Sequence, residues 1–204
     1  MNNNKHHRMK KNIARTKAIY IMLSLTGTGV SRMIKMYTRE PYSHASISLD
    51  EELDEMYSFA RKKVHNPFNA GFIKEDINTG VFAAYKGTQC CIYRYMITEA
   101  QYEKIKIVIE DFKKEQDKYT YSYLGVVLLT IHKARRSAYK FFCSEFVAYM
   151  LEQAGENLFN KESELVRPFD IRTCKKLNKV YEGRLDEYRN YLSNQQNLYK
   201  EQNA

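Results

Sequence analysis

Cys143 is the residue that the sequence marks for nucleophilic chemistry, because it directly precedes a predicted helix. Apolar residues at the spacing of one buried helical face indicate that helix, at Phe146, Val147, Met150, Leu151 and Ala154, and Gly155 follows as a stop. Unpaired N–H groups and the dipole of a first helical turn stabilise a thiolate, although Glu145 opposes this effect if it points the same way. The alternative is a buried structural cysteine, since free cysteine is among the most buried residue types.

A thiol nucleophile needs a base, and His44 is the histidine that the sequence places on a strand. The segment Ser43–Leu49 alternates strictly between polar side chains, including His44, on one face and apolar side chains on the other. A strand holds a side chain firmly enough for proton transfer. The other histidines lie in a basic arm, a loop and a basic stretch, at His6, His7, His65 and His132. His44 is therefore the predicted base, with a structural histidine as the alternative.

The elements that must position these two residues fit one domain. The chain has 204 residues and 44% hydrophobic residues, enough for a folded core. We expect a basic, disordered arm at residues 1–16, a single domain at 17–192 and a polar tail at 193–204, with no internal repeat.

The local patterns within the domain predict strands and helices in alternation. Strands are expected at Ala18–Leu25, at Leu53–Phe59 as a hairpin with the His44 strand, at Val81–Tyr85 and at Cys90–Met96. Residues 61–79 contain turn residues and are predicted to be mostly loop. Helices are expected at Ser31–Tyr37, from Thr98 to about Gln116, within Tyr119–Ile131, and from Asp170 or Thr173 to about Leu192.

Charge and cysteine usage limit the partners. The net charge of +9 is partly concentrated in the first 17 residues, so we expect no nucleic acid but a weak contact of this arm with anionic membrane. The four cysteines show no CxxC or Cys/His ligand spacing, which predicts reduced thiols, no structural metal and no cofactor. The apolar run at residues 18–25 lacks a small-x-small cleavage site, so we expect a cytoplasmic protein without a signal peptide.

Three short blocks of the chain resemble a known family. They are Pro41-Tyr42-Ser43-His44-Ala45-Ser46-Ile47 after the Thr26-Gly27-Thr28 turn, Phe142-Cys143-Ser144-Glu145-Phe146-Val147, and Pro168-x-Asp170. Together they are similar to the YiiX/YebB-like proteins, circularly permuted members of the NlpC/P60 superfamily of papain-like cysteine hydrolases. The resemblance covers roughly residues 17–188. His44 precedes Cys143, the order that the permutation requires.

The resemblance implies an α+β fold, in which an antiparallel sheet or barrel packs against the helix carrying the cysteine. It also implies that the strand after the histidine carries a polar residue, often glutamate, that orients the histidine ring. That residue falls within Asp54–Ser58, and we select Glu55. Since the sequence does not settle which face of this strand meets His44, Ser58 and Asp54 stay open, and a solvated charge is the structural alternative for Glu55.

The function implied by the resemblance is that of a cysteine peptidase or amidase with Cys143, His44 and Glu55 as its triad. The expected substrate is an amide or ester in a small peptide, a peptidoglycan fragment of the cell wall or a lipid. The alternatives are a lipid acyltransferase or esterase of the same superfamily and a catalytically inactive binding module. A sulfur within reach of the His44 ring and open to a cleft favours an enzyme, whereas a buried Cys143 with His44 turned away favours the module.

Overall fold

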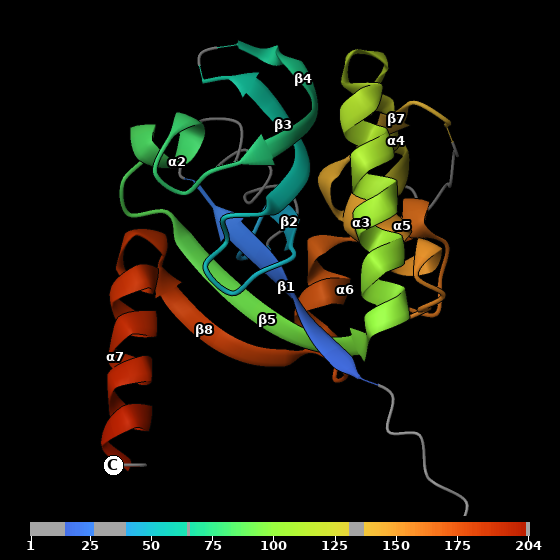
Figure 1. The fold of residues 1–204 in the computed structure, drawn as a ribbon. Helices are drawn as coiled ribbons and strands as arrows, with labels where there is room; N and C mark the ends of the chain where they lie inside the picture. Colours follow the sequence, from blue (N-terminus) through green and yellow to red (C-terminus); the bar gives the residue numbers. More distant parts are fainter. Residues whose placement is uncertain (1–14, 27–39, 65, 131–136, 203–204) are drawn as a thin grey trace, which may run out of the picture.

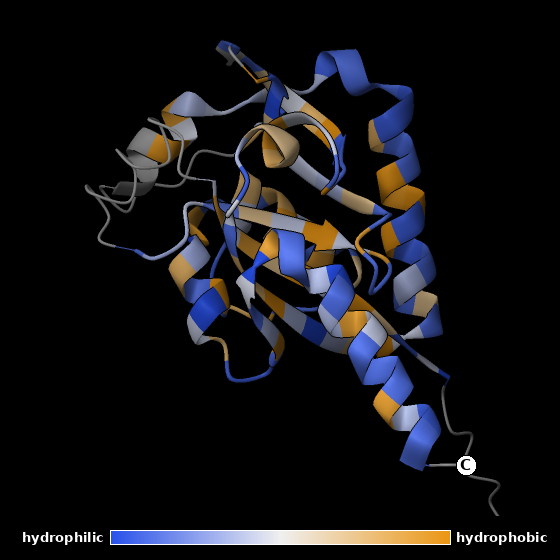
Figure 2. Ribbon diagram, turned by 90° about the vertical axis from the view of Figure 1, so that its left-hand side faces the viewer, coloured by the Kyte–Doolittle hydropathy of each residue, from blue (hydrophilic) through white to orange (hydrophobic). Residues whose placement is uncertain are grey.

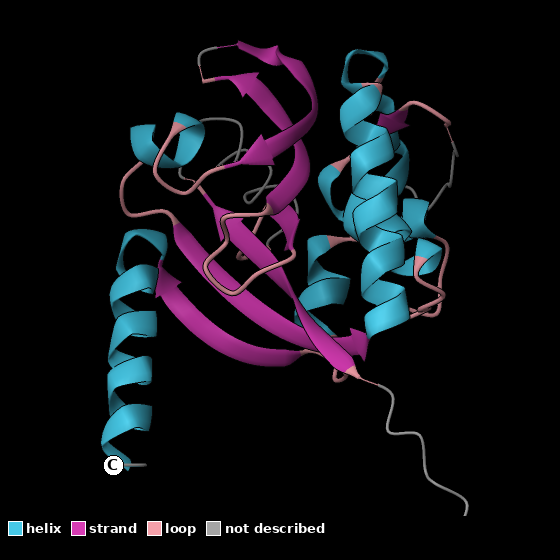
Figure 3. Ribbon diagram, viewed as in Figure 1, coloured by secondary structure: helices cyan, strands magenta, loops and turns pink. Residues whose placement is uncertain are grey.

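The computed structural model describes residues 15–26, 40–64, 66–130 and 137–202, which form an α+β fold around one open sheet (Figures 1 and 3). The eight strands lie in the order β7-β6-β4-β3-β2-β1-β5-β8. Their bounds are β1 Thr16–Leu25, β2 His44–Ser48, β3 Met56–Lys63, β4 Asn66–Glu75, β5 Gln89–Thr98, β6 Thr120–Tyr121, β7 Lys140–Phe141 and β8 Asn178–Arg184. The α-helices are α2 Gly80–Ala84, α3 Glu99–Lys114, α4 Tyr123–Thr130, α5 Cys143–Gln153, α6 Pro168–Thr173 and α7 Tyr188–Gln202.

The sheet is mixed, which corrects the expectation of an antiparallel one. Neighbouring strands pair antiparallel from β6 through to β8, whereas β7 runs parallel to β6. The parallel pair follows from the connection, because the chain leaves β6 through α4 and must cross back before it forms β7. The closure of the sheet into a barrel is not seen, since β7 and β8 are its two edges.

The two faces of the sheet bury separate apolar clusters. The larger cluster lies between the sheet and the helices α3 and α5, and it includes Ala45 and Ile47 of β2. The smaller cluster, with Met22, Met56 and Phe82, lies on the opposite face, where α7 packs (Figure 1). Figure 2 shows the matching pattern on α3 and α7, where hydrophobic positions interrupt mainly hydrophilic helices. The strands of the sheet therefore have no fully solvated face at their centre.

Aromatic packing fixes α5 against the sheet. The ring of Phe59 on β3 lies 5.3 Å from that of Phe146 on α5 and 5.2 Å from that of Phe141, measured between centroids. Such pairs contribute about 0.5–1.5 kcal/mol each beyond the burial of their area. Because Phe146 lies one helical turn after Cys143, this packing sets the position of the helix start.

Several predicted elements are confirmed. The strands expected at residues 18–25, 43–49 and 90–96 are β1, β2 and β5, and the helix after Thr98 is α3, with Thr98 accepting a hydrogen bond from Gln101 N–H. The helix after Cys143 is α5, and Gly155 beyond its end has a φ of 83°, a conformation that favours glycine. The helix expected within residues 119–131 is α4.

Other predictions are wrong. Residues 61–79 are not mostly loop, since they hold the end of β3 and all of β4, and Val81–Tyr85 falls mainly in the helix α2. The single last helix is replaced by α6, β8 and α7, and α7 continues to Gln202 through most of the expected polar tail. The helix expected at Ser31–Tyr37 and nearly all of the basic arm lie outside the described residues. Among the described residues, no helix is long and apolar enough to cross a membrane.

Candidate active site

The two residues selected for nucleophile and base lie together. Helix α5 begins at Cys143 and packs on β2, which begins at His44, so that the sulfur and the imidazole ring interact directly. The backbone N–H groups of Ala45 and Ser144 also approach the sulfur. Cys143 is only 5% exposed, whereas the His44 side chain is 17% exposed. The structure thus combines the contact expected of an enzyme with a sulfur that is largely covered.

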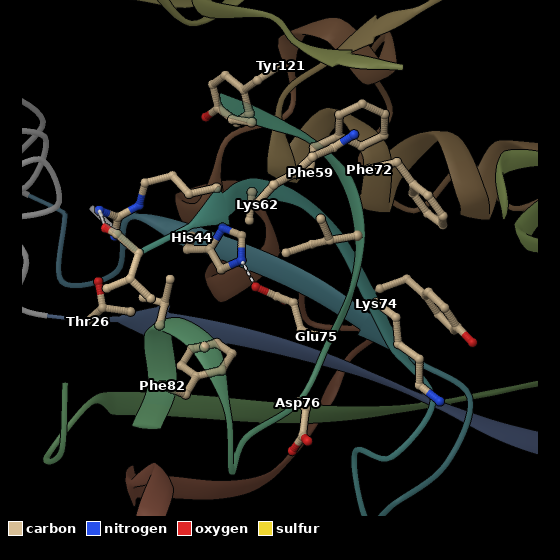
Figure 4. Close-up of a pocket in the computed structure, with 18 of the residues that line it drawn as sticks. Thr26, His44, Phe59, Lys62, Phe72, Lys74, Glu75, Asp76, Phe82 and Tyr121 are labelled. Atoms are coloured by element: carbon tan, nitrogen blue, oxygen red, sulfur yellow. Dashed lines mark hydrogen bonds and ion pairs between the residues drawn. The ribbon is translucent and has the colours of Figure 1, made fainter. Parts of the chain in front are cut away.

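The carboxylate that faces His44 belongs to Glu75, at the end of β4. Its Oε1 lies 3.0 Å from His44 Nε2, and Figure 4 shows the ring directed at this carboxylate. Glu75 thus contacts the Nε2 side of the ring that also interacts with Cys143. The side chain of Glu75 is 7% exposed, so the pair is nearly withdrawn from solvent. The order Cys143, His44, Glu75 is that of a nucleophile, a base and an orienting group.

Glu55, the predicted orienting residue, is not placed against His44. It lies in the turn before β3, where its carboxylate accepts hydrogen bonds from Lys74 Nζ at 2.5 Å and from the Tyr57 hydroxyl. Asp54 is also at the surface and pairs with Arg189 of α7 at 2.6 Å. Ser58 is buried and faces Glu75 rather than His44. None of the three residues considered from the sequence therefore contacts the ring.

Glu75 escaped the sequence analysis because its segment was predicted to be loop. The two strands β3 and β4 pair in register with Met56 opposite Glu75, which places Glu75 one strand further from β2 than Glu55 was expected to be. Residues 70–75 read Ala-Gly-Phe-Ile-Lys-Glu and do not alternate between apolar and polar side chains, so no local strand pattern marked Glu75.

The electrostatics of the site favour an ion pair. Burial alone would lower the pKa of His44, but the charge of Glu75 and the contacts with Cys143 and Glu75 outweigh it and raise that pKa to about 10. Burial alone would raise the pKa of Cys143, but the interaction with His44 and the two backbone N–H groups lower it. The two shifts are opposite, and each favours the charged form of its group, so the contact between Cys143 and His44 favours a thiolate–imidazolium pair.

Glu145 does not cancel this effect, since the pKa of Cys143 is lowered with the Glu145 carboxylate in place at the start of α5. Its Oε2 accepts a hydrogen bond from the Phe142 N–H at 3.1 Å. The other cysteines differ from Cys143 in their surroundings. Burial raises the pKa of Cys90 to about 12 and also raises that of Cys91, and all four cysteines are free thiols.

Tyr121 on β6 is a site residue that the sequence analysis missed. Burial raises the pKa of its phenol well above the ordinary value, and the charge of Cys143 raises it further. The phenol is therefore neutral and can donate a hydrogen bond toward the sulfur, with which its side chain interacts. One tyrosine among 17 carries no signal of its own in a single sequence.

A cavity of about 760 Å³ adjoins the site. Its lining includes His44, Glu75 and Tyr121 (Figure 4), whereas Cys143 is not among the lining residues. The lining is mainly aromatic and aliphatic, with several cationic side chains, including Phe59, Phe72, Val81, Phe82, Val126, Arg61, Lys62, Lys74 and Lys113. A cavity of this size accepts a small organic molecule or a chain segment.

The described residues were also searched for the ligands of a metal ion. Among the described residues, no group of three or more His, Cys, Asp or Glu side chains is arranged to hold a metal ion. His6, His7, His65 and His132 lie outside the described part of the chain. No family model, curated protein or solved structure matches this sequence.

Proposed function

We propose that this chain is a cysteine hydrolase of the circularly permuted papain-like type, with Cys143 as nucleophile, His44 as base and Glu75 as orienting residue. The observation that carries the proposal is the continuous, nearly buried set of contacts from sulfur to ring to carboxylate. The opposite pKa shifts of Cys143 and His44 support it, because perturbed groups in contact beside a cavity are typical of acid–base sites.

The permuted arrangement is supported by chain order and by packing. The histidine strand precedes the cysteine helix in the sequence, and α5 packs directly on β2. This is the arrangement implied by the YiiX/YebB-like resemblance of the His44 and Cys143 blocks. Glu75 then takes the place that the resemblance had suggested for Glu55.

The proposed reaction has two half-reactions. The Cys143 thiolate attacks an acyl carbonyl carbon, and the C–N or C–O bond breaks as imidazolium His44 gives its proton to the leaving amine or alcohol. The resulting thioester is then attacked by water, whose proton passes to His44, and the acid and the free cysteine are released. The N–H groups at the start of α5 and the Tyr121 hydroxyl are the donors available to the carbonyl oxygen.

The expected substrates are amides or esters with an apolar segment. The aromatic and aliphatic lining of the cavity suits the side chain of a peptide or the acyl chain of a lipid. If an alcohol or amine replaces water in the second half-reaction, the same residues perform acyl transfer. The cationic side chains of the lining would favour substrates that also carry a negative charge.

A non-catalytic binding module is the second candidate function. The burial of the Cys143 side chain favours it. A sulfur that is 5% exposed must gain access to a carbonyl carbon before it can react.

The two candidates are separated by intact-mass measurement after mixing with p-nitrophenyl hexanoate. For the hydrolase we expect an acyl adduct on Cys143, release of p-nitrophenol with turnover, and loss of both in Cys143→Ala. Cys174→Ala, which removes a partly exposed thiol elsewhere, serves as the matched control and should behave like the wild type. If the wild-type chain forms no adduct and turns over neither ester nor anilide substrates, the hydrolase is contradicted and the binding module is the remaining candidate.

A further inference from the structure

Buried serines line the face of the sheet that carries His44. Ser24, Ser46, Ser48 and Ser58 are each at most 1% exposed, and they lie on three neighbouring strands. Hydroxyl groups withdrawn from water need hydrogen-bond partners, because an unpaired one costs about 1–3 kcal/mol. Two of these serines, Ser46 and Ser58, lie against the carboxylate of Glu75, and this placement requires a reason.

Ser46 touches both members of the pair that orients the base. Its hydroxyl donates a hydrogen bond to Glu75 Oε2 and lies 3.2 Å from His44 Nε2. The other carboxylate oxygen, Oε1, lies 3.0 Å from His44 Nε2. Since each oxygen has its own partner, the plane of the carboxylate is fixed relative to the ring.

Ser58 and Ser24 extend this polar layer. The Ser58 side chain faces Glu75 and lowers the pKa of that carboxyl, although its hydroxyl has no hydrogen-bond partner among the described residues. Ser24 on β1 lies opposite His44 in the strand register, and its hydroxyl likewise has no hydrogen-bond partner among the described residues. Ser46 is thus the member of the layer with the firmest contact to the carboxylate.

A carboxylate at this depth needs donors in place of water. Burial alone would raise the pKa of Glu75, but the charge and contact of His44 and the hydroxyls of Ser46 and Ser58 lower it. The remaining ionisable groups act from neighbouring elements. Cys143 of α5 faces His44. Tyr121 of β6 interacts with Cys143, and the charge of Glu145 raises the pKa of Tyr121.

We propose that Ser46 is a positioning residue, whose hydroxyl keeps Glu75 ionised and directed at His44, so that the imidazolium and the Cys143 thiolate persist over a wide pH range. The inference rests on the proposed function and deepens it. Without the Ser46 hydroxyl, Glu75 takes a proton more easily and stabilises the imidazolium less. The pH range in which the ion pair exists should then narrow from both sides.

The test is the rate of Cys143 alkylation by iodoacetamide, resolved by peptide mass spectrometry, between pH 4 and pH 11. In Ser46→Ala we expect the rate at a pH on the acid limb of the profile to fall on the order of tenfold, which corresponds to the loss of one charge-assisted hydrogen bond. The acid limb of the profile should move to higher pH, and the inflection at which His44 loses its proton should move to lower pH. Ser46→Thr keeps a hydroxyl and should restore the wild-type profile to within about twofold.

Ser48→Ala is the matched control. Ser48 lies on the same strand and face and is equally buried, but its hydroxyl accepts from the Asp50 N–H at 3.4 Å instead of serving Glu75. Its profile should not change. An unchanged profile in a folded Ser46→Ala, or an equal change in Ser48→Ala, would overturn the proposal. If Ser46→Ala does not fold, Ser46→Cys, with its weak donor, must shift the profile in the same direction.

The alkylation profile separates this inference from the proposed function, because it needs no substrate. A wild-type chain that labels fast at Cys143 but hydrolyses neither ester nor anilide contradicts only the hydrolase. A chain that hydrolyses these substrates, yet keeps its alkylation profile in Ser46→Ala, contradicts only the role of Ser46.

Discussion

Glu55, just before the β3–β4 hairpin, and Glu75, at its end, both have lowered pKa values but for different reasons. At the turn before β3, burial is the largest influence on Glu55 and raises its pKa, but the contacts with Lys74 and Tyr57 together outweigh burial and lower it, and 44% of the side chain remains exposed. At the end of β4, burial acts more strongly on Glu75, yet His44 and two serines hold its pKa low. The pKa is therefore lowered at both glutamates. Only Glu75, which is buried against His44, is placed to orient a base.

The largest expected difference between the two glutamates is in turnover. Glu75→Gln should lower kcat on ester substrates by on the order of 10⁴-fold, as loss of the orienting carboxylate does in a serine protease triad. Glu55→Gln should stay within about twofold, because its contacts end at Lys74 and Tyr57. Steady-state kinetics on both variants measures kcat. A comparable loss of kcat in the two variants would contradict the assignment of Glu75 as the orienting residue.

The next difference is in stability. Removing one partner of a buried charge pair leaves the other uncompensated, so Glu75→Gln should lower the free energy of unfolding by about 3 kcal/mol near pH 6. Urea unfolding monitored by tyrosine fluorescence measures it. A loss below about 1 kcal/mol would show that the Glu75–His44 pair carries no more weight than a surface ion pair.

The stability difference should also depend on pH. The pKa of His44 is raised to about 10 in the folded chain, so its contribution is complete below the unfolded value of about 6.5 and is lost as the pH rises through about 10. The pKa of Glu75 is lowered, so its contribution is present above its unfolded value and lost as the pH falls through the folded one. The advantage of wild type over Glu75→Gln should therefore peak between about pH 5 and pH 6.5. A flat difference from pH 5 to pH 10 would contradict the ion pair.

Tyr121 also interacts with the Cys143 sulfur, and its removal tests a contact that does not involve either glutamate. Tyr121→Phe keeps the ring but removes the hydroxyl that interacts with Cys143, so kcat should fall about tenfold with little change in stability. Tyr123→Phe on the adjoining helix α4, 45% exposed, is the control. Equal rates for Tyr121→Phe and wild type would remove Tyr121 from the site.

The smallest effect on stability is expected from breaking the ion pair between Glu55 and Lys74. Its pair with Lys74 is about half-exposed on both sides, so Lys74→Gln should change the free energy of unfolding by less than about 1 kcal/mol. The difference should shrink further as salt is added, because exposed charges are screened. Thermal or urea unfolding at low and high salt measures it, and a loss near 3 kcal/mol would make the two regions alike.

The sequence predicted the parts of the site that local patterns encode. Alternation around His44 identified β2, and the apolar spacing after Cys143 identified α5. The resemblance, and not the local pattern, supplied the reason to join them. Their proximity in the structure agrees with that step.

What the sequence missed depends on pairing between distant segments. Asn66, Pro67 and Gly71 favour a loop locally, but the register with β3 makes their segment the strand β4, with Pro67 near its start. Gly71 also belongs there for a steric reason, since a Cβ at this position would collide with the Tyr119 carbonyl oxygen across the β4–β6 contact. Val81–Tyr85 is too short an apolar run for its period to separate helix from strand.

The order of the site residues along the chain has a consequence for biosynthesis. His44 and Glu75 belong to neighbouring segments, 31 residues apart, whereas α5 follows only after β5, α3 and α4. A chain emerging from the ribosome can therefore assemble the base and its carboxylate while the nucleophile has not yet been made. The thiol gains its partner only when α5 docks on β2, so the reactivity of Cys143 reports the final stage of folding, and a nascent or misfolded chain carries an ordinary, slow cysteine.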